Sequence, residues 1–215
     1  SANNKLVAVV SDGAGSAKHS KIGAKIICDT LCDLLIKSDI SSIRSDVVKA
    51  IDAARQKLLL HRCNQSKTCA GLINFSATLV GVFYHNHKGV FFHIGDGAGI
   101  AFKNGEYGNF IISEPENGAF SCETYFYTMD EWKDCLRFTD FENANRILLM
   151  TDGVTGFAFS DDFYKIHRNF LIPVIEYLEH EPRKTYAVEA LRNTLNNSRA
   201  QRLNADDKTI LWAKL

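Results

Sequence analysis

The chain has 215 residues, of which 46% are hydrophobic and 23% charged, and its 25 Lys and Arg balance its 25 Asp and Glu. These values are ordinary for one globular domain with a sizeable core. The balanced charge gives no net attraction to nucleic acid or to an anionic membrane, and no apolar stretch approaches the ~20 residues of a membrane span. The N-terminus lacks the charged-then-apolar layout of a signal peptide, so we expect a cytoplasmic protein.

The six cysteines do not indicate zinc or a disulfide scaffold. None of them forms a Cys-x-x-Cys pair, and Cys28 and Cys32 are one helical turn apart inside an apolar pattern. Reduced thiols in a cytoplasmic protein are the better interpretation. The other four are Cys63, Cys69, Cys122 and Cys135.

The first third of the chain predicts one strand and two helices. Residues 6–10 form a short apolar run that is typical of a buried strand. Apolar residues then recur twice at helical spacing, and Ser42 or Ser45 can cap the second helix. The two apolar stripes are Ile22, Ile26, Ile27, Leu31, Leu34 and Leu35, then Val47, Ile51, Ala54 and Leu58.

From Ser76 onward the pattern predicts short strands, followed by helices and a last strand. The expected strands are residues 77–84, 90–95, 100–102, 110–112, 124–128 and 147–150, with a turn at 86–89. Helical patterns follow at 163–178 and 187–195, and Pro173 predicts a break in the first of them. A strand at 209–213 closes the chain.

This order of elements predicts an α+β fold in a single domain of residues 1–215. Adjacent strands with helices grouped in pairs favour antiparallel sheets with helices outside, whereas a regular βαβ series would favour a parallel sheet.

Three acidic motifs stand next to buried strands and carry most of the functional information. An Asp at the end of such a strand is costly unless its charge is paired or bound to a metal. Three carboxylates from distant segments are what a hard divalent cation needs, so the motifs together suggest a metal site. They are Asp12-Gly13-Ala14-Gly15, Thr151-Asp152-Gly153-Val154 and Asp206-Asp207-Lys208-Thr209.

These motifs, with two others, resemble the metal-dependent protein phosphatase 2C (PPM) family in its short bacterial form. The five matches run in family order over nearly the whole chain, which makes the set specific although each one alone is weak. They are Val9-Val10-Ser11-Asp12-Gly13-Ala14-Gly15 followed by Ile22-Gly23-Ala24, Ser76-Ala77-Thr78-Leu79-Val80, His93-Ile94-Gly95-Asp96-Gly97, Leu149-Met150-Thr151-Asp152-Gly153-Val154 and Asp206-Asp207-Lys208-Thr209.

The resemblance implies a four-layer α-β-β-α sandwich and a set of metal ligands. Asp12, Asp152 and Asp207 would hold one Mg²⁺ or Mn²⁺ ion and carry catalysis, and Asp12 would bridge to a second ion that the Gly13 carbonyl also contacts. Asp96, with Asp152, would bind a third ion. Alignment to the motif favours Asp207 over its neighbour Asp206, which would cap or face solvent, and requires the last strand to pair centrally near the strands of Asp12 and Asp152.

The implied activity is that of a Ser/Thr protein phosphatase that hydrolyses phosphomonoesters with a metal-activated bridging water. Paired Mg²⁺ or Mn²⁺ ions lie roughly 3.5–4 Å apart and ease the loss of a proton from a shared water. The implied partners are a phosphorylated protein and a cognate Ser/Thr kinase, with a monomeric state and neither nucleic acid nor membrane.

Two departures from the family leave alternatives open. The upstream strand and phosphate-binding Arg of the family are absent from this sequence, and Ala14 occupies a position where many eukaryotic members have a His proposed as general acid. One alternative is a catalytically weak pseudophosphatase that acts as a binding or regulatory module. The other is a phosphatase for a non-protein phosphoester.

Overall fold

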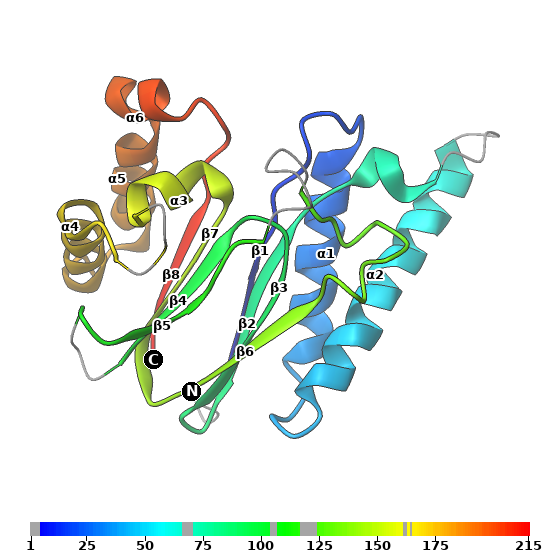
Figure 1. The fold of residues 1–215 in the computed structure, drawn as a ribbon, viewed down its shortest axis with the longest axis horizontal. Helices are drawn as coiled ribbons and strands as arrows, with labels where there is room; N and C mark the ends of the chain where they lie inside the picture. The colour runs from blue at the N-terminus through cyan, green and yellow to red at the C-terminus, as the bar shows by residue number, and fades with distance from the viewer. Residues whose placement is uncertain (1–4, 66–70, 104–106, 117–123, 161–162, 164) are drawn as a thin grey trace.

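Two four-stranded antiparallel sheets are stacked between two layers of helices in the computed structural model (Figure 1). The structure describes residues 5–65, 71–103, 107–116, 124–160, 163 and 165–215. The architecture confirms the predicted α+β class and the four-layer α-β-β-α arrangement.

The first sheet has the strand order β1-β2-β3-β6. A tight turn joins β2 to β3, and its central residues Asn86 and His87 have φ of 51° and 63°, as a two-residue hairpin with the right-handed strand twist requires. Strand β6 was not predicted. The strands are β1 (Lys5–Val10), β2 (Leu79–His85), β3 (Lys88–Ile94) and β6 (Arg137–Glu142).

The second sheet has the order β5-β4-β7-β8, with the last strand of the chain at one end. The prediction of a central position for this strand was wrong: β8 pairs with β7, with Met150 opposite Ile210, and with no other described strand. Pairing with β7 alone is enough to bring the segment before β8 close to Asp152, because Asp152 follows the end of β7. The strands are β4 (Ala98–Lys103), β5 (Phe110–Ser113), β7 (Ala144–Met150) and β8 (Ile210–Lys214).

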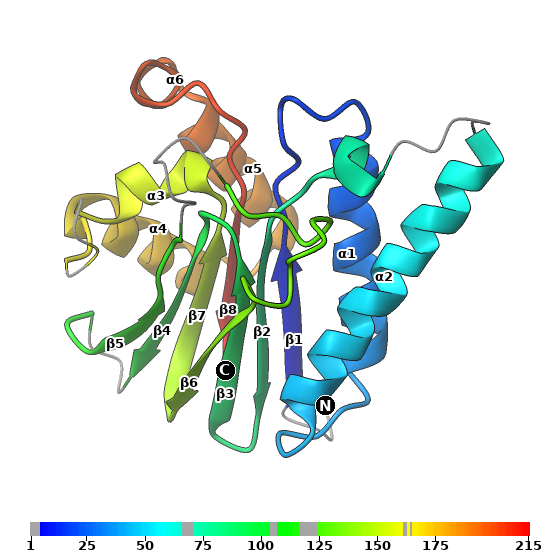
Figure 2. The same cartoon turned by 45° about the vertical axis from the view of Figure 1, so that its right-hand side comes forward.

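Helices cover the outer face of each sheet, as the turned view in Figure 2 also shows. The first sheet is covered by α1 (Ser20–Leu35) and α2 (Ile43–Gln65), with a short 3₁₀ helix η1 (Leu72–Phe75) beside them. The second sheet carries α3 (Asp152–Ala158), α4 (Arg168–His180), α5 (Lys184–Asn196) and α6 (Ser198–Leu203). No helix among the described residues has the length and apolar character to cross a membrane.

The apolar core is divided into three layers that follow this architecture. Leu31 of α1 and Leu58 of α2 are fully buried against the first sheet, and Leu171 of α4 is fully buried against the second. Between the sheets, Phe91 packs on Phe141 with ring centroids 4.7 Å apart. Each such buried side chain contributes roughly 1.5–3 kcal/mol, so the sheets are fixed on both faces.

Two local predictions were wrong because burial outweighs local sequence signals. Helix α4 continues through Pro173, where a break was expected, and its buried side chains Leu171, Ile175 and Leu178 hold it on the sheet. The strand expected at 124–128 is a bridge residue followed by a turn, in which the buried Tyr127 donates a hydrogen bond to the Gly23 carbonyl (2.8 Å).

The cysteines that the structure describes carry free thiols. These are Cys28, Cys32 and Cys135. The side chain of Cys63, and Cys69 and Cys122, lie outside the described residues.

Candidate metal centre

Asp12 is held just after β1 by hydrogen bonds between its backbone and Thr78, in the segment before β2. The Asp12 amide donates to Thr78 Oγ1 (3.0 Å), and the Thr78 amide donates back to the Asp12 carbonyl (2.8 Å). Two residues later, the Ala14 amide donates to the Ser76 carbonyl (2.9 Å). These bonds extend the β1–β2 pairing past the strand and fix the backbone that presents the Asp12 carboxylate.

Gly13 follows in the same loop, where there is no room for a side chain. A Cβ at this position would lie 2.8 Å from Ser20 Cβ at the start of α1. The glycine therefore allows the metal loop to pass directly against α1.

Asp152 is the first residue of α3 and follows β7 after a single residue. Its Oδ1 accepts a hydrogen bond from the Gly153 amide (2.8 Å). A carboxylate in the first turn of a helix also interacts favourably with the helix dipole. The Asp152 side chain is half-buried. Because Asp152 follows β7, its side chain lines the same cavity as Asp12 and the loop after it.

The loop between α6 and β8 brings a third carboxylate to this edge. The Thr151 amide donates to the Thr209 carbonyl (3.1 Å), and the Thr209 amide donates to Thr151 Oγ1 (3.0 Å). Lys208 Nζ donates to the Asn204 carbonyl (2.7 Å) and to the Asp206 carbonyl (2.8 Å). The loop is thus tied both to the end of β7 and to itself.

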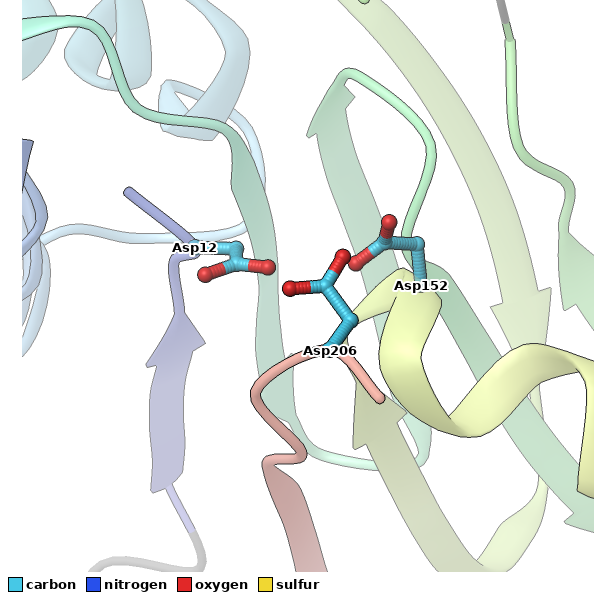
Figure 3. Close-up of side chains that lie close together, drawn as sticks. All are labelled: Asp12, Asp152 and Asp206. Atoms are coloured by element: carbon cyan, nitrogen blue, oxygen red, sulfur yellow. The ribbon is translucent and has the colours of Figure 1, made fainter. Parts of the chain in front are cut away.

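The carboxylate in the cluster is that of Asp206, and not that of Asp207. One carboxylate oxygen from each of Asp12, Asp152 and Asp206 lies within 4.8 Å of the others, and Figure 3 shows the three side chains converging. Asp207, the ligand expected from motif alignment, is not part of this group. Its backbone carbonyl packs on α3, where a Cβ on Gly153 would lie 2.1 Å from the oxygen.

The carboxylates of the centre perturb one another strongly. Burial, followed by the neighbouring carboxylates of Asp152 and Asp206, raises the pKa of Asp12 to about 7. Burial and the charge of Asp96 raise the pKa of Asp152. Like charges held together in this way are relieved by a proton or by a cation, and oxygen ligands of this type suit Mg²⁺ or Mn²⁺. The donor set therefore fits the metal that the sequence suggests.

Asp96, the expected ligand of a third ion, lies in the turn between β3 and β4 and lines the same cavity. Thr124 Oγ1 donates a hydrogen bond to Asp96 Oδ2 (2.7 Å). Asp96 is therefore within the site but outside the group of three carboxylates.

The cavity has a volume of about 580 Å³, with one acidic side and one apolar side. Besides the aspartates, the metal loop from Gly13 to Ser16 lines it, and Tyr125, Phe126 and Met129 form the apolar side. None of the described lining residues is a Lys, Arg or His.

Sequence reasoning missed the side chains that support the aspartates. Thr78 and Thr151 both lie within the motifs, but their hydrogen bonds join segments that are distant in sequence. Tyr125 and Phe126 on the apolar side of the cavity lie in the segment 124–128 that was predicted to be a strand; the only sequence signal for their role is the aromatic density of that segment.

The sequence matches the family described as "Protein phosphatase 2C" over residues 1–196, and the chain belongs to this family. The Asp206 loop lies beyond the matched segment. Comparison with curated protein sequences gives no match.

Solved structures of bacterial phosphatases share the fold. The catalytic domain of the serine/threonine protein phosphatase PstP in complex with two manganese ions is 15% identical, with a TM-score of 0.62 over 98% of this chain and 90% of that one. Stp1 from Staphylococcus aureus is 14% identical, with a TM-score of 0.63 over 99% and 84%. PppA from Pseudomonas aeruginosa is 14% identical, with a TM-score of 0.63 over 96% and 84%. At such identities, the similarity establishes the fold alone.

Proposed function

We propose that this protein is a metal-dependent Ser/Thr protein phosphatase that hydrolyses phosphomonoesters. The observation that carries the proposal is the convergence of Asp12, Asp152 and Asp206 from three distant segments onto one cavity. Membership in the protein phosphatase 2C family supports the reaction class.

Asp12, Asp152 and Asp206 would hold the first of two or three Mg²⁺ or Mn²⁺ ions. Asp12 and the Gly13 carbonyl would also bind a second ion, and Asp96 together with Asp152 would bind a third. When bound, such ions lower the pKa of a shared water and neutralise charge on the phosphoryl oxygens. The two manganese ions of the PstP complex support this assignment by analogy.

The protein's own residues contribute orientation and exclusion of water. The hydrogen bond from the Asp12 amide to Thr78 fixes the backbone that carries the Asp12 carboxylate, and the bond from Thr124 orients the Asp96 carboxylate itself. Tyr125 and Phe126 shield one side of the cavity and would contact the carbon skeleton of the phosphorylated residue. Since no described lining residue is a His and Ala14 has no proton to give, the leaving group would take its proton from water or from another residue.

A binding module that keeps the fold is the second candidate, and one observation favours it. No Lys or Arg is among the described residues that line the cavity, so no guanidinium is there to position a phosphoryl group through a bidentate contact. Loss of one such contact costs ~10²–10³ in rate. We therefore expect a slow enzyme rather than an inactive one, because the carboxylates are all present.

Turnover of p-nitrophenyl phosphate tests the proposal. We expect activity with Mn²⁺ or Mg²⁺, complete loss in EDTA, and recovery when the metal is restored. Asp12→Ala and Asp152→Ala should each remove most of the activity while circular dichroism shows an intact fold. Undiminished turnover in EDTA would contradict metal dependence, and a panel of phosphopeptides and small phosphoesters would separate protein from non-protein substrates.

A further inference from the structure

A second concave surface, with a volume of about 850 Å³, lies among α3, α4, α5 and α6. We call it the α3–α6 groove and define it by Phe157 of α3, Arg168 and Phe170 of α4, and Arg199 and Leu203 of α6. It is separate from the metal cavity and shares none of its described lining residues.

The floor of the α3–α6 groove is apolar and open to solvent. The rings of Phe157 and Phe170 pack with centroids 5.8 Å apart, and the Leu203 side chain is 68% exposed. Phe170 also lines a smaller apolar hollow of about 310 Å³ between α4 and α5, so the apolar surface continues along α4. A contiguous apolar surface of this kind with a polar rim is typical of a site that binds a partner.

The charge of the groove is opposite to that of the metal centre. Arg168 and Arg199 are both exposed, and neither guanidinium has an ion-pair partner among the described residues. No acidic side chain is found in the described lining. A guanidinium binds a carboxylate through two parallel hydrogen bonds, so two unpaired arginines above an apolar floor suit an acidic peptide that carries an apolar side chain.

Two residues of the α3–α6 groove are close in sequence to aspartates of the metal centre. Phe157 is five residues after Asp152 on the same helix, which corresponds to about 7.5 Å at 1.5 Å per residue. Leu203 is three residues before Asp206. An extended peptide advances about 3.3 Å per residue, so roughly two to three residues separate a phosphorylated residue at the metal centre from a segment in the groove.

We propose that the α3–α6 groove binds an acidic segment of the phosphoprotein substrate, about two to three residues from the phosphorylated residue. An apolar side chain of that segment packs on Phe157, Phe170 and Leu203, and its carboxylates pair with Arg168 and Arg199. The assignment of this segment to a substrate rests on the proposed phosphatase function, whereas the binding of an acidic peptide does not.

The binding step is tested in EDTA, where no turnover is needed. The probe is a fluorescein-labelled peptide of Glu, Asp and Leu, compared by fluorescence anisotropy with a peptide in which Gln and Asn replace the acids. We expect the acidic peptide to bind more tightly, and the double variant Arg168→Gln/Arg199→Gln to bind it about 3- to 10-fold more weakly, as expected for two solvent-exposed charge pairs. Leu203→Ser should also weaken binding, but without changing its dependence on salt.

The matched control is Arg192→Gln, which removes an exposed arginine of α5 outside the groove. It should bind the acidic peptide like the unaltered protein. Equal binding of the two peptides, an equal loss in the control, or binding to anionic phosphatidylserine vesicles in place of the peptide would overturn the proposal.

Turnover then separates the groove from the phosphatase assignment. With Mn²⁺, a phosphothreonine peptide with acids placed two to three residues away should have a lower KM than the same peptide with Gln and Asn in place of the acids. The double arginine variant should remove this preference while p-nitrophenyl phosphate turnover stays unchanged. Turnover without any preference overturns the groove alone. Peptide binding without turnover of any phosphoester refutes the phosphatase proposal and leaves the groove as a peptide-binding site.

Discussion

The contact between Gly153 and the Asp206 loop predicts that Gly153→Ala damages the metal centre. The backbone carbonyl of Asp207 rests on the first turn of α3, where an added Cβ would lie 2.1 Å from the oxygen and 3.0 Å from the carbon. Real Cβ atoms stay beyond 3.0 Å of such neighbours, so the loop has to move outward by about 1 Å. Lys208 Nζ donates to the Asp206 carbonyl, so the Asp206 carboxylate moves with the loop.

The size of the effect follows from that displacement. A misplacement of about 1 Å in a catalytic group costs about 10²-fold in rate. We therefore expect kcat/KM of Gly153→Ala for p-nitrophenyl phosphate to fall by about two orders of magnitude, together with weaker Mn²⁺ binding in isothermal titration calorimetry.

Gly156→Ala is the matched control on the same helix, because a Cβ there meets nothing within 4 Å. Alanine is favoured over glycine inside a helix by about 1 kcal/mol, so this variant should be slightly more stable and fully active on p-nitrophenyl phosphate. If Gly153→Ala kept both its activity and its Mn²⁺ affinity, the loop would not be fixed by this contact and the argument would be wrong.

Three further outcomes follow from the structure. Asp206→Asn should lose at least about 100-fold in activity on p-nitrophenyl phosphate and bind Mn²⁺ poorly, while Asp207→Asn stays close to the unaltered protein; the reverse order would return the ligand role to Asp207. Lys208→Met keeps the side-chain stem and removes two charged hydrogen bonds to loop carbonyls, so Mn²⁺ affinity measured by calorimetry should fall about tenfold, with partial recovery in Lys208→Arg. Burial, aided by the charge of Arg137, lowers the pKa of His93 from 6.5 to about 3. Above pH 6.5 this histidine is neutral in both folded and unfolded chains, but below it only the unfolded chain takes up the proton, so stability falls as the pH drops from 6.5 toward 3. Urea denaturation should show about 2 kcal/mol more loss between pH 7.5 and pH 5 in the unaltered protein than in His93→Gln, and equal losses would contradict the buried neutral state.

The parts of the fold that follow from local pattern were predicted well. The apolar run of β1, the hairpin turn after β2 and the stripes of α1 and α2 all depend on side-chain periodicity and turn chemistry within a few residues of one another. Strand β6 was missed because its only apolar residues, Phe138 and Phe141, are three positions apart, which gives neither an apolar run nor the alternation typical of a strand.

The errors concern features that only tertiary contacts decide. Pro173 stays inside α4 because three buried side chains hold that helix on the sheet. The position of β8 beside β7 is set by strand pairing, which has no signal in the sequence of β8 itself.

The choice between Asp206 and Asp207 as a ligand also depends on tertiary contacts. The two residues are adjacent in a loop without strand or helix periodicity. A motif alignment that is displaced by one residue therefore exchanges one aspartate for the other. The packing of the Asp207 carbonyl on Gly153 and the lysine bonds to the loop decide which carboxylate reaches the cluster. The presence of an acidic centre was therefore predictable from sequence, but its exact membership was not.

The three clustered carboxylates come from both sheets of the sandwich. Asp12 extends from the first sheet, whereas Asp152 and Asp206 belong to the ends of β7 and β8 in the second. A cation held by all three would therefore act as a cross-link between the two halves of the sandwich. At a hundred times its dissociation constant, such a ligand adds about 2.7 kcal/mol to the free energy of unfolding. The supply of divalent cations would then govern how long the chain survives heat and proteases, in addition to how fast it works.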